Sequence, residues 1–342
     1  MHPSATWGYI AQRILGTLPL LLAVCVFTFV LVRVLPGDPA VYYATGPMAT
    51  EEEIDATRKA LGLDRPMPEQ LVRYLKDVAA GDLGRSLTTG QPVSSDLRQR
   101  FAASMELTLV ALVLAMAIGI PLGVAAAIRS GSLLDHIVRF VGTIGVSMPA
   151  FVTGLVLIFV FFFHLGIAPE PIDRMDPFLT APPTVTGFLL IDAPLAGNFE
   201  AFASAAARLV LPAATMAAFV VAPLMRITRA SMLAVLGSDF IRTARAAGLS
   251  WWTVYVRYGL RNALLPVLTT IALVFSYLLG ANVVVEKVFA WPGVGSYALN
   301  ALLATDYAPV QGYVLLMALS FVVVNTAVDI LYVLIDPRMH AS

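Results

Sequence analysis

Six long runs without a charged side chain alternate with polar stretches along the chain. A helix needs about 20 apolar residues to cross the hydrocarbon core of a bilayer. The runs lack the strict alternation of apolar and polar positions that strands of a membrane barrel show. Because backbone groups in lipid must be hydrogen-bonded within the segment, the runs predict an all-α membrane protein with six transmembrane helices, at residues 14–32, 107–128, 140–163, 209–225, 263–285 and 308–328.

Two of these runs contain possible helix breaks. The fourth is the shortest, and Pro212 and Pro223 lie near its ends, so the pattern does not fix its limits. In the third, Ser147, Met148 and Pro149 interrupt the apolar sequence near its start. Gly119 and Gly123 in the second run predict a small surface for helix packing, although Pro121 between them weakens a dimer-motif interpretation.

The composition supports the membrane assignment and excludes other classes. The chain is 58% hydrophobic and 13% charged, whereas a soluble domain carries about 25% charged residues. Its net charge is zero, so no global basic field indicates binding to nucleic acid. Cys25 is the one cysteine and the four histidines are scattered, so we expect no disulfide and no metal site.

Lysine and arginine in the short connections predict the orientation. With the N-terminus inside, the inner segments carry ten arginines and the short outer segments carry three basic residues. The remaining nine lie in residues 33–100, a segment long enough to cross largely regardless of charge. The positive-inside rule therefore places both termini in the cytoplasm.

The inner connection between the fourth and fifth runs has an unusual composition. It reads RTARAAGLSWWTVYVRYGLRNALLP from residue 242, with four arginines, two tryptophans and no acid. Ser238 and Asp239 are good N-caps for a helix over residues 240–247, and Gly248 is suited to a left-handed helix end. Ser250 can begin a second helix over residues 251–261, so the pattern predicts helix, glycine break and helix.

Three interpretations of this loop remain open on composition. Small residues at 244 and 246–248 allow another backbone to approach closely, which favours a docking element. The arginines and tryptophans are equally typical of a helix on the membrane surface, with arginine on anionic headgroups. A solvated loop that obeys the positive-inside rule is the third interpretation.

The same stretch resembles a known motif. RTARAAG followed by LSWWTVYVRYGLR is similar to the EAA loop of ABC importer permeases, and the departures at Arg242, Thr243 and Arg261 resemble the variant of the dipeptide, oligopeptide and nickel importer family. Further pieces resemble that family and occur in the same order along the chain: LPGDPA (35–40), GDLGRSL (81–87), VSMPAF (146–151), MRITRASML (225–233), EKVFAWPGVGSYAL (286–299) and DILYVLIDPR (329–338).

The resemblance implies a type I ABC importer permease fold in a bacterial or archaeal cytoplasmic membrane. It implies a pore-forming subunit of an ATP-driven, binding-protein-dependent importer for short peptides or a related small solute. Its partners would be a second homologous permease subunit, two cytoplasmic ABC ATPases and an extracytoplasmic substrate-binding protein. The residues that match the ATPase-docking loop are Arg242, Thr243, Ala244, Arg245, Ala246, Ala247, Gly248, Leu249 and Trp251.

The chain itself is not expected to be an enzyme. It contains no GxxxxGK[ST] phosphate loop, so we expect no bound cofactor here and ATP with Mg²⁺ on the partner ATPases. The alternative is a secondary transporter driven by an ion gradient, which intramembrane carboxylates or inverted repeats would favour. Ser147, Met148, Pro149 and Asn282 are candidates for lining a solute path, although helix packing alone explains them equally well.

The pattern also predicts a division of the chain. In the segment 34–106, two amphipathic stretches predict short helices in an extracytoplasmic cap, whereas residues 165–207 are rich in proline and weakly patterned. Trp291 and Tyr297 are expected in a turn at the depth of the membrane interface. The expected parts are 1–33 (first span), 34–106 (cap), 107–163 (spans two and three), 164–208 (outer loop), 209–285 (spans four and five with loop 226–262) and 286–342 (outer turn, last span and C-terminus).

Overall fold

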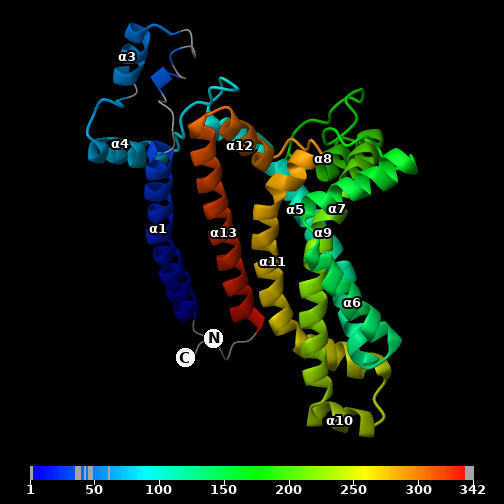
Figure 1. Cartoon of the computed structure of the whole chain (residues 1–342). Helices are drawn as coiled ribbons and strands as arrows, with labels where there is room; N and C mark the ends of the chain where they lie inside the picture. The colour runs from blue at the N-terminus through cyan, green and yellow to red at the C-terminus, as the bar shows by residue number, and fades with distance from the viewer. Residues whose placement is uncertain (1–2, 35–39, 42–43, 45–48, 61, 336–342) are drawn as a thin grey trace. The chain divides into compact units, whose positions relative to one another are not determined.

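The computed structural model describes residues 3–34, 40–41, 44, 49–60 and 62–335. Across these residues the regular structure is helical apart from one isolated bridge between Arg85 and Pro92. The chain divides into two compact units, shown in Figure 1. The first comprises residues 1–102 and 292–326, and the second comprises residues 103–291 and 327–342.

The first unit combines the N-terminal part of the chain with residues 292–326 near its C-terminus. The first and last predicted spans lie in α1 (Pro3–Val34) and α13 (Tyr307–Ile335). The two amphipathic stretches form α3 (Glu51–Ala60) and α4 (Met67–Ala79), which confirms the predicted short helices. Arg33 at the end of α1 donates from Nε to Gln70 Oε1 of α4 over 3.0 Å.

The N-terminal ends of two helices contact each other inside the first unit. Val93 and Leu97 of α5 (Val93–Ile128) pack with Val294 and Tyr297 of α12 (Val294–Leu303). The Tyr297 hydroxyl donates to Asp96 in the first turn of α5 over 2.9 Å. A carboxylate is favoured in a first turn because the free N–H groups there carry positive charge.

A second carboxylate extends this link to the segment that precedes α5. Asp306, which lies directly before α13, is fully buried. Its Oδ2 accepts from Ser86 Oγ over 2.7 Å and from the Thr88 amide over 3.0 Å. The pieces GDLGRSL and WPGVGSY, which the sequence offered separately, therefore meet in one buried network.

We expect Tyr297→Phe to lower the free energy of unfolding by about 2 kcal/mol, because a buried hydrogen bond to a charged group is lost. Of its side-chain hydrogen bonds within the described residues, the Asp96 carboxylate would keep the one from Thr89 Oγ1 at 2.5 Å. Thermal unfolding in detergent measures the loss. Tyr277→Phe, which changes a side chain with 59% of its surface exposed, is the matched control and should leave the midpoint unchanged.

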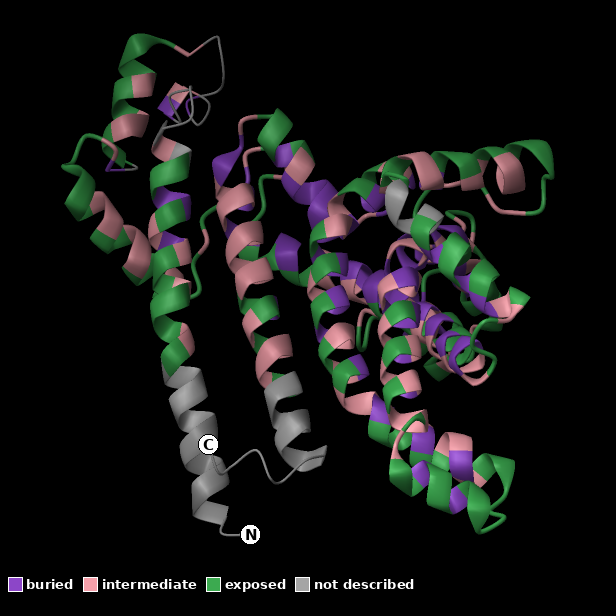
Figure 2. Cartoon of the chain, turned by 60° about the horizontal axis from the view of Figure 1, so that its bottom comes forward, coloured by how far each residue is buried: buried purple, intermediate pink, exposed green. Residues whose placement is uncertain are grey.

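The second unit holds the other predicted spans. Residues 107–128, 209–225 and 263–285 lie in α5, α9 (Phe199–Leu236) and α11 (Arg261–Val288). Helix α9 is thus much longer than the fourth apolar run, and Pro212 and Pro223 lie inside the helix rather than at its ends. In Figure 2 the buried residues of this unit concentrate along α9, beside which α6 (Leu133–Ser147) and α11 lie.

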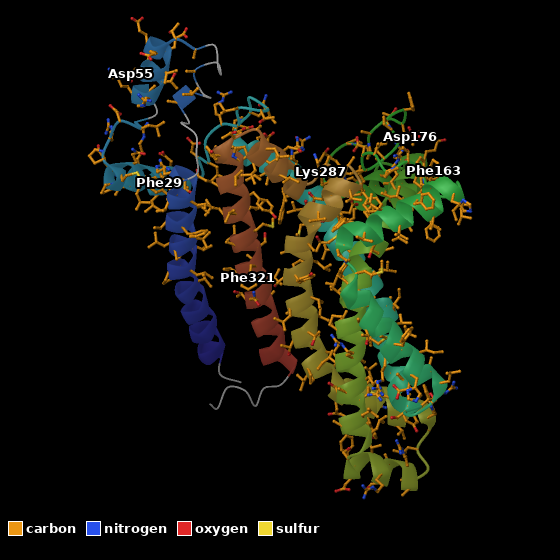
Figure 3. All side chains as sticks on the ribbon, in the orientation of Figure 1. Phe29, Asp55, Phe163, Asp176, Lys287 and Phe321 are labelled. Carbon is orange, nitrogen blue, oxygen red and sulfur yellow. The ribbon has the colours of Figure 1, made fainter. Side chains whose placement is uncertain are left out.

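By length and composition, four helical stretches of the described chain can cross a membrane: Val93–Ile128, Phe199–Leu236, Trp252–Val288 and Tyr307–Ala327. Shorter apolar stretches are Gly16–Leu31, Ala150–His164 and Val294–Leu303. Large apolar side chains are exposed on several of them, as at Phe321 on α13 and Phe163, both labelled in Figure 3. Such side chains suit a lipid environment better than water.

The run 140–163 is not one continuous helix, and it breaks at the interruption that the sequence shows at residues 147–149. Helix α6 ends at Ser147, and α7 (Ala150–Leu157) begins after Pro149 and continues as the π-helix η2 (Ile158–His164). Proline disfavours the helical conformation of the residue before it, and Met148 is extended with φ −93° and ψ 131°. Figure 1 shows α6 and α7 running in different directions.

The glycine pair in α5 packs as expected of small residues, and its partner is within the chain. A Cβ atom added to Gly119 would lie 3.1 Å from the Val221 carbonyl oxygen of α9. One added to Gly123 would lie 2.7 Å from the Met225 carbonyl oxygen. The packing prediction is confirmed, and the two glycines allow the α5 and α9 backbones to approach closely.

The weakly patterned residues 165–207 form an ordered connection. Helix α8 (Leu189–Leu195) presents the buried Asp192, which accepts from the amides of residues 185, 186 and 187 and from Thr186 Oγ1. Arg174 lies 2.6 Å from the buried Glu106 carboxylate of α5 in a salt bridge. The partners are 68 residues apart, which is why the local sequence pattern gave no indication of this pair.

Trp291 and Tyr297 are buried within the protein rather than exposed at its surface. They are 2% and 4% exposed, and the Trp291 indole donates to the Ala103 carbonyl over 3.0 Å. Their depth relative to the membrane interface stays a prediction. Each places its polar group on a protein acceptor, which is the usual arrangement for a buried tryptophan or tyrosine.

Candidate partner-docking site

The predicted loop between the fourth and fifth spans forms a helical hairpin. Helix α10 (Asp239–Ala246) is followed by Gly248 at φ +69° and by the π-helix η3 (Trp252–Leu260). The Leu249 amide donates to the Ala244 carbonyl and the Gly248 amide to the Arg245 carbonyl. These two bonds define a Schellman helix end, for which glycine is preferred because it takes the left-handed conformation at no steric cost.

The hairpin has a small apolar interior. Ile241 and Ala244 of α10 pack against Val254 of η3 and are fully or almost fully buried. Ala244, one of the predicted docking residues, therefore faces the second arm of its own hairpin. The Arg245 guanidinium lies 5.4 Å from the centroid of the Tyr255 ring, which adds a cation–π contact between the arms.

The other predicted docking residues share one property, which is exposure. Leu249 is 41% and Trp251 56% exposed, and Arg242 forms a surface ion pair with Asp239 at 3.3 Å, which contributes little. Arginine and tryptophan are enriched in protein–protein interfaces, so this surface can contact a protein partner. The exposed members are Arg242, Thr243, Arg245, Ala246, Ala247, Gly248, Leu249 and Trp251.

The hairpin is mechanically continuous with two long helices. At its start, Val235 and Leu236 of α9 pack against its apolar interior. At its end, η3 runs directly into α11, and Trp252–Val288 forms one helical stretch. A Cβ atom on Gly259 would lie 3.3 Å from the Met232 methyl group, so η3 also packs closely on α9. These contacts connect α10 to both α9 and α11.

The four residues predicted to line a solute path are not brought together. Met148 and Pro149 are exposed at the junction of α6 and α7, and the side chain of Ser147 lies outside the described part of the structure. Asn282 is 3% exposed and faces α5, where its Nδ2 donates to the Ser104 carbonyl and to Thr108 Oγ1, each over 3.2 Å. Its observed contacts are those of helix packing, and the solute path stays a prediction.

Asn282 belongs to a buried polar cluster whose other members the sequence analysis did not single out. One helical turn further along α11, the fully buried Glu286 accepts a hydrogen bond from Ser104 Oγ. The Asn282 amide oxygen has no hydrogen-bond partner in the described chain. The sequence could have indicated this cluster, because Asn282 and Glu286 lie four residues apart on one apolar helix and buried polar groups require hydrogen-bond partners.

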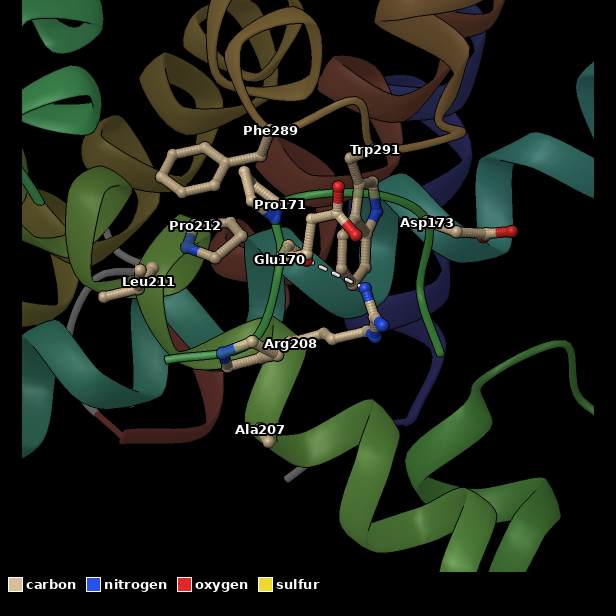
Figure 4. A pocket seen from close by; sticks show the side chains of 10 residues that line it. Glu170, Pro171, Asp173, Ala207, Arg208, Leu211, Pro212, Phe289 and Trp291 are labelled. Atoms are coloured by element: carbon tan, nitrogen blue, oxygen red, sulfur yellow. Dashed lines mark hydrogen bonds between the residues drawn. The ribbon is translucent and has the colours of Figure 1, made fainter. Parts of the chain in front are cut away.

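A pocket beside Trp291 is shown in Figure 4. Arg208 closes one side by donating from Nη1 to the carbonyl oxygens of Glu170 and Ile172, over 2.8 and 2.6 Å. The pocket has room for about one water molecule, so it is too small for a peptide. Among the residues that the structure describes, no three histidine, cysteine, aspartate or glutamate side chains form a group that could hold a metal ion.

The order of these elements agrees with known transport proteins. A family model for the inner membrane component of binding-protein-dependent transport systems matches residues 119–341, and a model for the N-terminal part of such components matches residues 7–108.

Three relatives are similar over almost their entire length. The probable D,D-dipeptide transport system permease protein of Escherichia coli (strain K12) is 43% identical over 333 residues, 97% of both chains. The dipeptide transport system permease protein of the same strain is 40% identical over 338 residues, 97% of this chain and 98% of the relative. The glutathione transport system permease protein of Escherichia coli O6:H1 is 37% identical over 333 residues, 97% and 99% respectively. The chain belongs to the family of inner-membrane permease components of binding-protein-dependent transport systems.

Proposed function

We propose that the chain is one pore-forming subunit of an ATP-driven importer for short peptides or a related small solute. The relatives named above carry dipeptide, D,D-dipeptide or glutathione transport in their names. The observation that carries the proposal is the exposed α10 surface on a hairpin continuous with α9 and α11. Such a surface is suited to coupling a cytoplasmic partner to the membrane helices.

The proposed assembly contains two ABC ATPases, a second homologous permease subunit and an extracytoplasmic binding protein. ATP and Mg²⁺ would be held by the ATPases, because this chain has no phosphate-binding loop of the Walker type. We further propose six spans, both termini in the cytoplasm, and the division of the chain given above. The interrupted segment of α6, α7 and η2 would then supply the third span as a broken helix.

In the proposed mechanism, nucleotide binding closes the ATPase pair and displaces α10. The apolar contact of Ile241 and Ala244 with Val254 makes the two arms move together. Because η3 continues into α11 and packs on α9, the displacement biases these helices between two access states. The permease supplies no chemistry in this cycle, only a coupled change in shape.

We expect Arg245→Glu to weaken association with the ATPases at least tenfold, because it reverses a charge on the docking surface and removes the contact to Tyr255. Co-purification of the transporter with its ATPases, and peptide uptake into proteoliposomes that contain the binding protein, measure the effect. Arg129→Glu, at another exposed arginine in the turn before α6, is the matched control and should retain both activities. Normal association of the Arg245 variant would refute the docking role.

The alternative is an ion-gradient-driven secondary transporter. The buried Glu286 is an ionisable group on a membrane-length helix, and such groups are often part of ion pathways. Uptake that survives ATP depletion and stops when the ion gradient is collapsed would favour this alternative. Uptake that follows ATP and ignores the gradient is the expected result.

A further inference from the structure

A group of exposed residues at the end of the hairpin lies outside the assigned docking surface of α10. It consists of Trp252, Arg257 and Tyr258 of η3 and Arg261, the first residue of α11; we call it the headgroup face. Trp252 is 65% and Tyr258 37% exposed. The buried positions pack against other parts of the second unit instead, Val254 against α10 and Gly259 and Ala263 against α9.

The two arginines of the headgroup face lack a carboxylate partner. Residues 240–285 contain no acidic residue, and in the described chain neither arginine forms a salt bridge. Arg174 and Arg229, by contrast, are each paired with a buried carboxylate. Two unpaired guanidinium groups separated by one helical turn are complementary to a phosphate, which arginine binds with two parallel hydrogen bonds.

The length of α11 places this face at the depth of lipid headgroups. The uncharged run 263–285 contains 23 residues and is about 35 Å long at about 1.5 Å per residue. The hydrocarbon core is about 30 Å thick. With Glu286 and Lys287 at the far end of this run, Arg261 and η3 therefore lie at the other surface of the bilayer.

The aromatic members fit the same location. Tryptophan and tyrosine are enriched where hydrocarbon meets the headgroups, because their rings are partly apolar and their N–H or O–H remains hydrated. Trp252 and Tyr258 are both large, exposed and adjacent to the start of a membrane-length helix. In Figure 1 the segment between α10 and α11 passes beside the lower part of α9 before α11 ascends.

We propose that the headgroup face binds the phosphate of an anionic phospholipid in the leaflet next to the docking hairpin. Arg257 and Arg261 hold the phosphate, and Trp252 and Tyr258 pack at the edge of the acyl chains. The lipid would thereby fix the depth of η3 in the membrane surface. The inference uses the membrane location of the family and does not require that α10 binds an ATPase.

The test is a titration of the assembled transporter, purified in detergent, with phosphatidylglycerol. Native mass spectrometry gives the Kd for the lipid. We expect Arg257→Gln with Arg261→Gln to raise the Kd about 30-fold, since each basic residue near an anionic surface contributes about 1 kcal/mol. The pair Arg257→Lys and Arg261→Lys keeps both charges but loses the two parallel hydrogen bonds of each arginine, so its Kd should lie between those of the unchanged protein and the glutamine variant.

Two further measurements separate this proposal from protein docking. Arg245→Glu should leave the phosphatidylglycerol Kd unchanged even where it weakens ATPase association, and the double glutamine variant should keep its ATPases. An unchanged Kd in the glutamine variant would overturn the proposal. Loss of the ATPases with an unchanged Kd would show that the face belongs to a protein partner, while phosphatidylcholine binding as tight as phosphatidylglycerol would exclude recognition of the anionic headgroup.

Discussion

Arg229→Gln is expected to lower the free energy of unfolding by about 4 kcal/mol, because it leaves a buried carboxylate without its cation. Asp135 at the beginning of α6 is 1% exposed. Arg229 of α9 donates to both of its carboxylate oxygens, from Nε over 2.5 Å and from Nη2 over 2.7 Å. Thermal unfolding of the detergent-solubilised chain, followed by tryptophan fluorescence, measures the loss.

Removing the other partner of this ion pair should lower the free energy of unfolding by less. In Asp135→Asn the residue left without its partner is Arg229, whose side chain is 23% exposed and can therefore turn toward water. The double variant should be more stable than the sum of the two single losses predicts, because no isolated buried charge remains. Additive losses would mean that the two side chains do not interact in the folded protein.

The same pair predicts a response to acid. The Arg229 guanidinium and the Gly131 amide hold the pKa of Asp135 at about 2, below its usual value. A group whose pKa is lowered by folding stabilises the fold above its ordinary pKa, near 4, and this contribution is lost as pH falls toward 2. Between pH 5 and 8 the contribution should be constant, and Asp135→Asn should abolish the additional loss of stability below pH 4.

The sequence predicts the helices well where the physical cause is local. Uncharged runs have to be helical in lipid, and the left-handed Gly248 follows from its position after a short helix. The break between α6 and α7 was visible as Pro149, although the apolar run continued through it. Helix length was harder to predict, because α9 extends well beyond its apolar core on both sides.

The pairs that hold the helices together could not be predicted from local pattern. Arg229 was recognised only as part of a motif and as an inner-side charge, because its partner Asp135 is 94 residues away. The burial of Trp291 was not predicted, because exposed and buried tryptophans have the same local sequence signal. Within the candidate docking loop, composition did not reveal that Ala244 faces inward, since all the small residues of α10 look alike until the second arm is in place.

Gly123→Ala is expected to destabilise the chain by about 3 kcal/mol, because overpacking at a close helix contact forces backbone movement. The added Cβ would lie 2.7 Å from the Met225 carbonyl oxygen and 2.7 Å from Thr228 Cβ. Thr228 is fully buried and its hydroxyl donates to the Leu224 carbonyl over 2.7 Å, so this part of α9 cannot yield through a side-chain rotation.

Gly280→Ala in α11 is the matched control, since no described atom lies within 4 Å of the added Cβ. In a helix interior alanine is favoured over glycine by about 1 kcal/mol, so the control should be neutral or slightly stabilising. Replacing Thr228 with alanine removes Cγ2, which lies 3.1 Å from the added Cβ, but keeps the Thr228 Cβ position and the Met225 carbonyl oxygen at 2.7 Å, so it should not rescue Gly123→Ala. Rescue by that second substitution would mean that α5 and α9 can separate at little cost, and that the backbone contact does not set their distance.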